Sequence, residues 1–253
     1  WDLQVASSSE YSHVVVRPDG SIGLVATNGL TTNYQDRGGA LVPVRLTGGQ
    51  LQTDGLAPVV VRNSDGSFSV TSKSATAVFA IDGDSSVANL VSLSSGDRPV
   101  LGQQWKGGLL REISDPVSKR TVTLIYGGGS CPSTGSGFVA APKDLLCQVK
   151  FWDGTTTSFG YVQGADGTPT IGRFVDLAEA KGDGAQVTDL AYDGAGRIAR
   201  VRSPFVAQVA SAGLIAADDS QYQVAAAYDE RGRVATLTEF AASDGANRCV
   251  HTY

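Results

Sequence analysis

Two stretches of the sequence decide the fold: Tyr192–Ala199, which reads YDGAGRIA, and Tyr228–Ala235, which reads YDERGRVA. Both follow the pattern Y-D-x-x-G-R-[IV]-A, and they begin 36 residues apart. An eight-residue match at a fixed distance is typical of an internal repeat. Because the unit is short and rich in turn-forming residues, it indicates strands joined by tight turns.

Each position of this pattern has a predicted role. The aspartate caps the turn through its carboxylate, and the glycine three residues later takes the left-handed conformation of a type I turn with a G1 bulge. The tyrosine ends the outgoing strand, and the arginine begins the returning one. We therefore interpret eight residues as turn and inter-repeat packing elements: Tyr192, Asp193, Gly196, Arg197, Tyr228, Asp229, Gly232 and Arg233.

The rest of the chain carries the same strand and turn chemistry. Aspartate outnumbers glutamate by 20 to 5, and there are 31 glycines, which favours turns over helices. Three hairpins are predicted: Val14–Val25, Val59–Val70 and Cys147–Tyr161. The predicted fold class is all-β, with antiparallel hairpin repeats forming a curved or spiralling sheet. Asp176–Lys181 and Val206–Ala217 are the candidate helices, and either stretch is equally compatible with a loop.

At these residues the sequence resembles the Rhs/YD-repeat family, found in bacterial Rhs polymorphic toxins, in the C component of Tc toxins and in teneurins. The resemblance rests on the two Tyr-Asp copies, on Gly108–Pro116 (GLLREISDP) and on Arg202-Ser203-Pro204. It covers residues 101–253, interpreted as a repeat sheet truncated in mid-repeat. Residues 1–100 are a β-rich region of undecided type, either a plug-like domain or degenerate repeats.

The resemblance implies a β-ribbon that spirals into a hollow shell wall. In toxin members such a shell encloses a C-terminal effector, and in teneurin-like members it is an extracellular scaffold. The implied partners are the remaining repeats and an effector of the same polypeptide, and a cell-surface protein or glycan is an alternative partner. The family's C-terminal self-cleavage segment is absent, so any effector is expected beyond Tyr253.

Composition argues against two other kinds of partner. The net charge of −5 and the isoelectric point of about 5.0 give no electrostatic reason to bind nucleic acid. Apolar runs such as Ala77–Ile81 are only five residues long, whereas a membrane-spanning helix needs roughly 20. We therefore expect neither nucleic-acid binding nor membrane insertion.

The three cysteines indicate in which cellular compartment the protein folds. Cys131 and Cys147 bracket a segment with Pro132, Pro142 and several Gly and Ser residues, which favours a disulfide over reduced thiols. No histidine lies near them to complete a zinc pattern, so no metal or other cofactor is expected. The third cysteine, Cys249, either pairs outside the chain or is buried. With the resemblance, these features predict a secreted or cell-surface bacterial protein.

Catalytic residues are not predicted. The two histidines, His13 and His251, lie in strand patterns where a cross-strand hydrogen bond is the ordinary role, and no G-x-S-x-G motif occurs. A glycosidase would need a pair of carboxylates. The candidates for such a pair are Asp183, Asp189, Asp193, Asp218 and Asp219.

Three functions remain open from the sequence. The first is a non-catalytic shell segment that encloses or presents an effector. The second is an adhesin or carbohydrate-binding module, for which exposed Trp105 and Trp152 would be the binding aromatics. The third, a β-propeller-like enzyme acting on glycosides, requires convergent carboxylates in a cleft.

Overall fold

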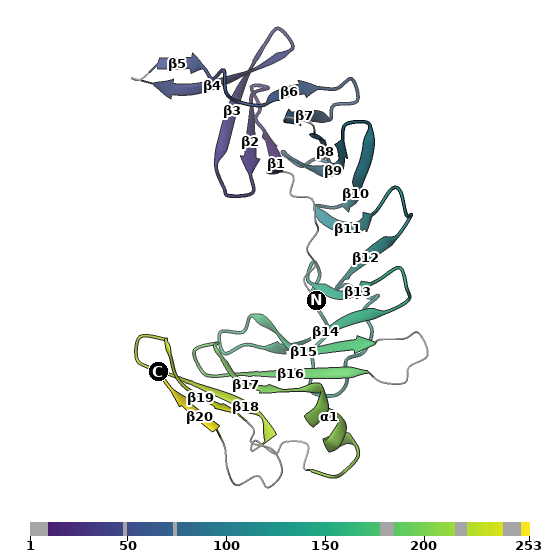
Figure 1. The fold of residues 1–253 in the computed structure, drawn as a ribbon, viewed down its shortest axis with the longest axis vertical. Coiled ribbons are helices and arrows are strands. Elements are labelled where there is room, and N and C mark those ends of the chain that lie inside the picture. Colours follow the sequence, from purple (N-terminus) through teal and green to yellow (C-terminus); the bar gives the residue numbers. More distant parts are fainter. Residues whose placement is uncertain (1–9, 48–49, 73–74, 178–184, 216–221, 240–248) are drawn as a thin grey trace. The chain divides into compact units, whose positions relative to one another are not determined.

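The computed structural model describes the chain in six ranges: residues 10–47, 50–72, 75–177, 185–215, 222–239 and 249–253. These residues form twenty strands and one short helix, and every strand ladder is antiparallel (Figure 1). The prediction of an all-β fold with a curved antiparallel sheet is confirmed. The chain divides into two compact units, Trp1–Thr123 and Leu124–Tyr253.

The first unit contains hairpins of short strands. Its strands are β1 (Tyr11–Val16), β2 (Ile22–Ala26), β3 (Thr31–Arg37), β4 (Ala40–Thr47), β5 (Gln50–Thr53), β6 (Val59–Arg62), β7 (Phe68–Ser72), β8 (Ala75–Ile81), β9 (Val87–Ser95), β10 (Arg98–Lys106), β11 (Leu109–Ser114) and the first half of β12 (Thr121–Tyr126). Strand β9 joins two runs of the sheet, because it pairs with β8 along its length, with β1 near its start and with β10 near its end. The hairpins predicted at Val14–Val25 and Val59–Val70 are present.

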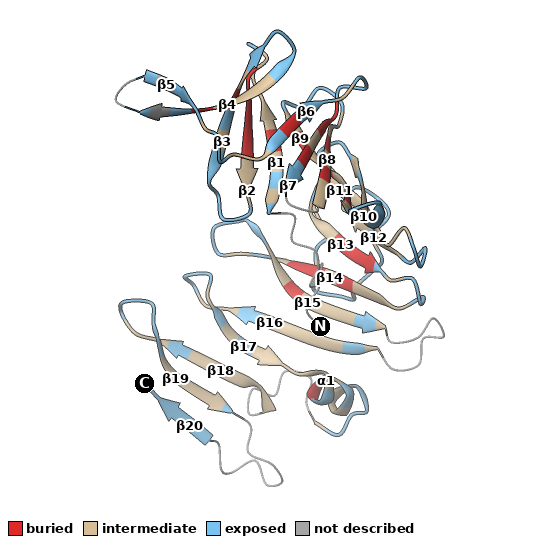
Figure 2. Cartoon of the chain, turned by 45° about the horizontal axis from the view of Figure 1, so that its top comes forward, coloured by how far each residue is buried: buried red, intermediate tan, exposed pale blue. Residues whose placement is uncertain are grey.

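The first unit also holds most of the buried apolar side chains (Figure 2). Alternate residues of its strands point into one cluster, as the two-residue period of a half-buried strand predicts. Within the described residues this cluster consists of Val14, Ile22, Leu24, Tyr34, Val60, Phe68, Val70, Ala77, Phe79, Ala88, Leu90, Leu93 and Leu101. This unit is therefore stabilised mainly by hydrophobic burial.

The second unit is a succession of hairpins with one helix. Its elements after β12 are β13 (Leu146–Lys150), β14 (Thr156–Gln163), β15 (Pro169–Leu177), β16 (Gln186–Tyr192), β17 (Ile198–Arg202), α1 (Pro204–Ser211), β18 (Val224–Tyr228), β19 (Val234–Glu239) and β20 (Cys249–Thr252). From β13 to β20 each strand pairs with the next. Only four apolar side chains described here are buried: Cys147, Val149, Tyr161 and Val206. Contacts between polar groups must therefore contribute more to this sheet than to the first unit.

Helix α1 overlaps one of the two predicted helices, Val206–Ala217. The Ser203 side chain accepts a hydrogen bond from the Val206 N–H and Pro204 is the first helical residue, which is a standard helix start. The predicted range, Val206–Ala217, begins two residues too late, because it was based on Ala content without this Ser-Pro start. It also runs past the helix end at Ser211, and residues 216 and 217 lie outside the described ranges. The other prediction, Asp176–Lys181, is wrong at its first two residues, which end strand β15. No described helix is long and apolar enough to cross a membrane.

Candidate functional site

The first Tyr-Asp turn is held by the Asp193 carboxylate. Its Oδ1 accepts hydrogen bonds from the N–H groups of Ala195 and Arg197, each at 2.9 Å, and its Oδ2 accepts from the Arg197 Nε at 2.8 Å. The Gly196 N–H donates to the Asp193 carbonyl at 3.0 Å, and Gly196 has a φ of +77°. This is the turn geometry that the motif predicts. The backbone and side-chain hydrogen bonds from Arg197 lower the pKa of Asp193.

The second copy repeats the first bond for bond. Asp229 Oδ1 accepts from the N–H groups of Arg231 and Arg233 at 2.9 Å, its Oδ2 accepts from the Arg233 Nε at 2.8 Å, and Gly232 has a φ of +78°. Six other turns place the capping residue directly before the glycine: Asp19, Asn28, Asp54, Asp65, Asp153 and Asp166. Those turns lack the arginine, so the Tyr-Asp turns carry an additional ion pair.

Tyrosines connect neighbouring strands of the second unit. The hydroxyls of Tyr161, Tyr192 and Tyr228 each donate a hydrogen bond of 2.6 to 2.7 Å to a backbone carbonyl in the preceding strand. Their acceptors are the carbonyls of Leu146, Ile171 and Ile198, in that order. The backbone pairing recorded between β15 and β16 stops at Arg173 and Asp189, short of Tyr192. The tyrosine therefore ties two strands together beyond the end of their ladder.

Arg197 links the two Tyr-Asp turns. Its guanidinium carbon lies 4.4 Å from the centre of the Tyr228 ring, a cation–π distance. The same arginine adds an electrostatic contribution that lowers the pKa of Asp229, alongside the larger effect of the hydrogen bonds from Arg233. The arginine of one turn thus stacks on the tyrosine of the next turn. Arg197 therefore forms an ion pair with the aspartate of its own turn and a cation–π contact with the tyrosine of the following turn.

Replacing Gly196 with valine tests the turn assignment. A side chain at φ +77° is strained although nothing lies within 4 Å of the site, so the cost is that of the backbone alone. We expect Gly196→Val to lower the free energy of unfolding by roughly 1 to 3 kcal/mol. The control is Gly194→Val, in the same turn and equally open but without a left-handed φ. Equal melting temperatures for the two variants would contradict the assignment.

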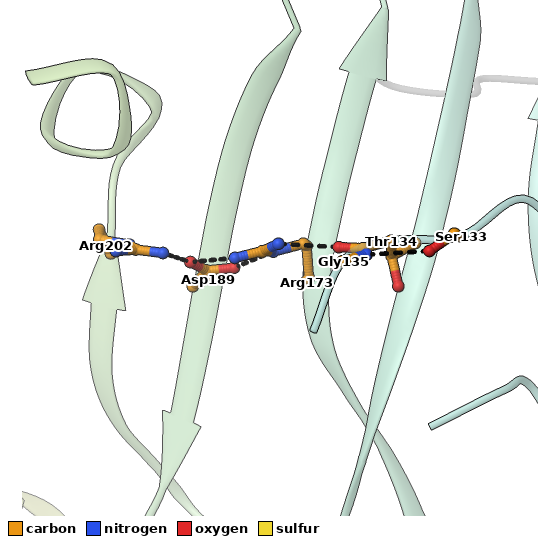
Figure 3. A network of polar contacts seen from close by, with 6 residues as sticks. All are labelled: Ser133, Thr134, Gly135, Arg173, Asp189 and Arg202. Carbon is orange, nitrogen blue, oxygen red and sulfur yellow. Dashed lines mark hydrogen bonds and ion pairs between the residues drawn. The ribbon is translucent and has the colours of Figure 1, made fainter. Parts of the chain in front are cut away.

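A second polar group crosses strands β15, β16 and β17 in one row (Figure 3). Arg173, Asp189 and Arg202 stand directly opposite one another in the strand register. Arg173 donates to Asp189 from Nε at 2.5 Å and from Nη2 at 3.0 Å, and Arg202 Nη2 donates to the same carboxylate. All three side chains are less than one fifth exposed. Burial raises the pKa of Asp189, but the hydrogen bonds and charges of both arginines outweigh it, so the pKa is lowered.

The segment that begins at Cys131 packs onto this row. The predicted disulfide between Cys131 and Cys147 is present, with a sequence separation of 16 residues. The Thr134 carbonyl accepts a hydrogen bond of 2.8 Å from Arg173 Nη1, and the Arg173 guanidinium lies 4.3 Å from the centre of the Phe138 ring. A Cβ at Gly160 would lie 2.7 Å from Thr134 Oγ1, so a larger residue there would force this segment to shift.

Two pockets flank the row. One, of about 330 Å³, lies between α1 and the sheet, and the other, of about 310 Å³, lies beside Phe138 and Gly172. Arg173 and Arg202 line both pockets. The row was missed because its members are 13 to 16 residues apart, a spacing that becomes a contact only through the strand register.

The remaining predicted site residues have separate positions. Trp105 is half-buried and its indole N–H donates a hydrogen bond of 2.8 Å to the Leu90 carbonyl, which gives it a structural contact. Trp152 lies in the turn after β13 and is 53% exposed, with its ring edge-on to Phe151. Cys249 is a free, exposed thiol 3.4 Å from His251 Nε2, and the expectation that it is buried is wrong for this chain.

The carboxylates considered for glycoside chemistry do not form a pair among the described residues. Asp189 binds two arginines, and Asp193 caps its turn. Asp183, Asp218 and Asp219 lie outside the described ranges. Within those ranges, no group of three or more His, Cys, Asp or Glu side chains is arranged to hold a metal ion.

Solved structures give weak likenesses to this chain, and two bacterial proteins are among them. No family model matches the sequence, and no curated protein matches it. The structure is similar to a chain of the Photorhabdus luminescens Tc holotoxin pore, with 10% identity and a TM-score of 0.34 over 88% of this chain and 14% of that chain. It is also similar to a porin-like protein from Bacteroides uniformis, with 12% identity and a TM-score of 0.26 over 97% of this chain and 96% of that one. At these TM-scores the likenesses define neither the topology nor a family for this chain.

Proposed function

We propose that this chain is a non-catalytic structural segment of an Rhs/YD-type shell wall, which encloses or presents a C-terminal effector of the same polypeptide. The proposal rests on the linkage between repeats: the arginine of one Tyr-Asp turn stacks on the tyrosine of the next, and that tyrosine bonds back to the preceding strand. Such contacts to the nearest neighbour extend a sheet without a deep core, as a wall requires. The disulfide agrees with a secreted or surface location.

The test uses the native polypeptide purified from its source, with peptide mapping and limited proteolysis. We expect additional Tyr-Asp repeats beyond residue 253 and a C-terminal region that co-purifies and resists protease while the wall is folded. In the native polypeptide, Arg197→Ala should expose that region to protease by removing the contact between turns, whereas Lys150→Ala, a change of an exposed lysine, should not. A native protein without further repeats, or a C-terminal region cut equally fast in both variants, would refute the proposal.

A second candidate function is glycan binding, and the exposure of Trp152 at a turn favours it. Exposed aromatic faces are common platforms for sugars because both stack through apolar surfaces. Glycan-array binding that is lost in Trp152→Ala and retained in Gln163→Ala would support this function. An array without signal would remove it and leave the shell-wall proposal unaffected.

A further inference from the structure

Three side chains that can bind a metal lie on one face of the last strand pair, β19 and β20. Cys249 and His251 are two residues apart on β20, so the alternation of a strand places them on the same face. Glu239 of β19 stands directly opposite Cys249 in the strand register, so it shares that face. All three residues are exposed. Strand register therefore brings together a thiol, an imidazole and a carboxylate from two strands.

The two groups on β20 have the separation that a tetrahedral zinc ion requires. Cys249 Sγ lies 3.4 Å from His251 Nε2. Zinc binds a thiolate at about 2.3 Å and an imidazole nitrogen at about 2.0 Å, and a tetrahedral angle between these bonds separates the two atoms by about 3.5 Å. One metal ion can therefore bind both atoms without a change in the backbone of β20.

We propose that Cys249, His251 and Glu239 bind one zinc ion, with water as its fourth ligand. A set of sulfur, nitrogen and oxygen ligands suits zinc, whereas calcium and magnesium take oxygen ligands. The Cys249 thiol releases its proton to solvent when it binds the ion.

The carboxylate completes the site by a rotation of its own side chain. In the described part of the chain no three such groups are already gathered around one point, so Glu239 must turn toward the other two. Directly opposite residues of an antiparallel pair have Cβ atoms about 5 Å apart, which a glutamate side chain can span. The bound ion ties β20 to β19 across the face of the sheet. A further strand added beside β20 would leave this face open, so the site is independent of the shell-wall proposal.

The experiment is a titration of the full chain with Co²⁺, with the Cys131–Cys147 disulfide intact and Cys249 kept as a free thiol. Cobalt is the probe because a thiolate bound to it gives a charge-transfer absorption, which zinc removes when it displaces the cobalt. We expect one Co²⁺ per chain, this thiolate absorption, and displacement by Zn²⁺ but not by the same concentration of Mg²⁺.

Variants of the three ligands have matched controls in the same chain. His251→Ala and Cys249→Ser should each weaken Co²⁺ binding by at least about tenfold, since even residues behind metal ligands contribute that much to affinity. The control for the histidine is His13→Ala, which removes the other imidazole of the chain, on β1. Glu239→Gln tests the third ligand against Glu230→Gln, the same change at an exposed turn residue.

Four results would overturn the proposal. The first is a titration without the thiolate absorption, and the second is equally tight cobalt binding by His251→Ala and His13→Ala. The third is equal binding by Glu239→Gln and Glu230→Gln, which would remove the carboxylate from the site. The fourth is one metal ion per two chains, because the remaining ligands would then come from a second copy.

Discussion

Reduction of the Cys131–Cys147 disulfide is expected to lower the free energy of unfolding of the second unit by about 3 kcal/mol. The bridge closes a loop with a sequence separation of 16 residues, and opening it returns chain entropy to the unfolded state. It also releases the segment whose Thr134 carbonyl and Phe138 ring contact Arg173. The loss should therefore be concentrated in strands β14 and β15, where that segment packs.

Hydrogen exchange of the oxidised and reduced protein measures this effect without a mutation. The oxidised protein is its own control, because the two forms have the same sequence and composition. Amides in residues 124–253 should exchange faster after reduction, whereas amides of the core strands β1 and β8 in the first unit should keep their rates. Unchanged exchange near Arg173 would show that the bridge does not hold this segment in place.

Asp189→Asn is expected to lower the free energy of unfolding by about 2 to 3 kcal/mol. The asparagine keeps the shape of the side chain but removes the only negative charge of the row, so two guanidinium groups face each other in a partly buried site. A fully buried pair that loses one partner costs about 3 to 5 kcal/mol, and the remaining exposure of this site reduces that figure. Urea unfolding of the variant and the parent gives the difference.

The double variant Asp189→Asn with Arg202→Gln separates charge repulsion from other losses. Removing the second arginine leaves one positive charge, so the double variant should be more stable than the sum of the two single changes predicts. The pH dependence provides a further check. Because the folded pKa of Asp189 is lowered, its stabilising contribution is present above about pH 4 and is lost as the pH falls below that value. If the losses in free energy of unfolding of the two single variants simply add, the two arginines do not interact through Asp189.

Local sequence was sufficient for the turns and the disulfide. Asp193 and Gly196 are three residues apart, and the hydrogen bonds that fix their turn lie within five consecutive residues. Such geometry depends on the chain's own steric limits, so the motif alone predicts it. The disulfide could be predicted in the same way, because Cys131 and Cys147 bracket one short segment rich in turn-forming residues. The all-β class followed from the same turn chemistry repeated along the chain.

Longer-range features required the tertiary structure. The stacking of Arg197 on Tyr228 depends on the path of the chain between the two turns, which the spacing of the motifs leaves undefined. The row of Arg173, Asp189 and Arg202 depends on register, because a shift of one residue would move every side chain to the opposite face. The sequence by itself thus determined the turns, the hairpins and the disulfide, where the interacting residues are close along the chain. Only the tertiary structure decided which charges meet across strands, because strand register brings together residues that no local pattern connects.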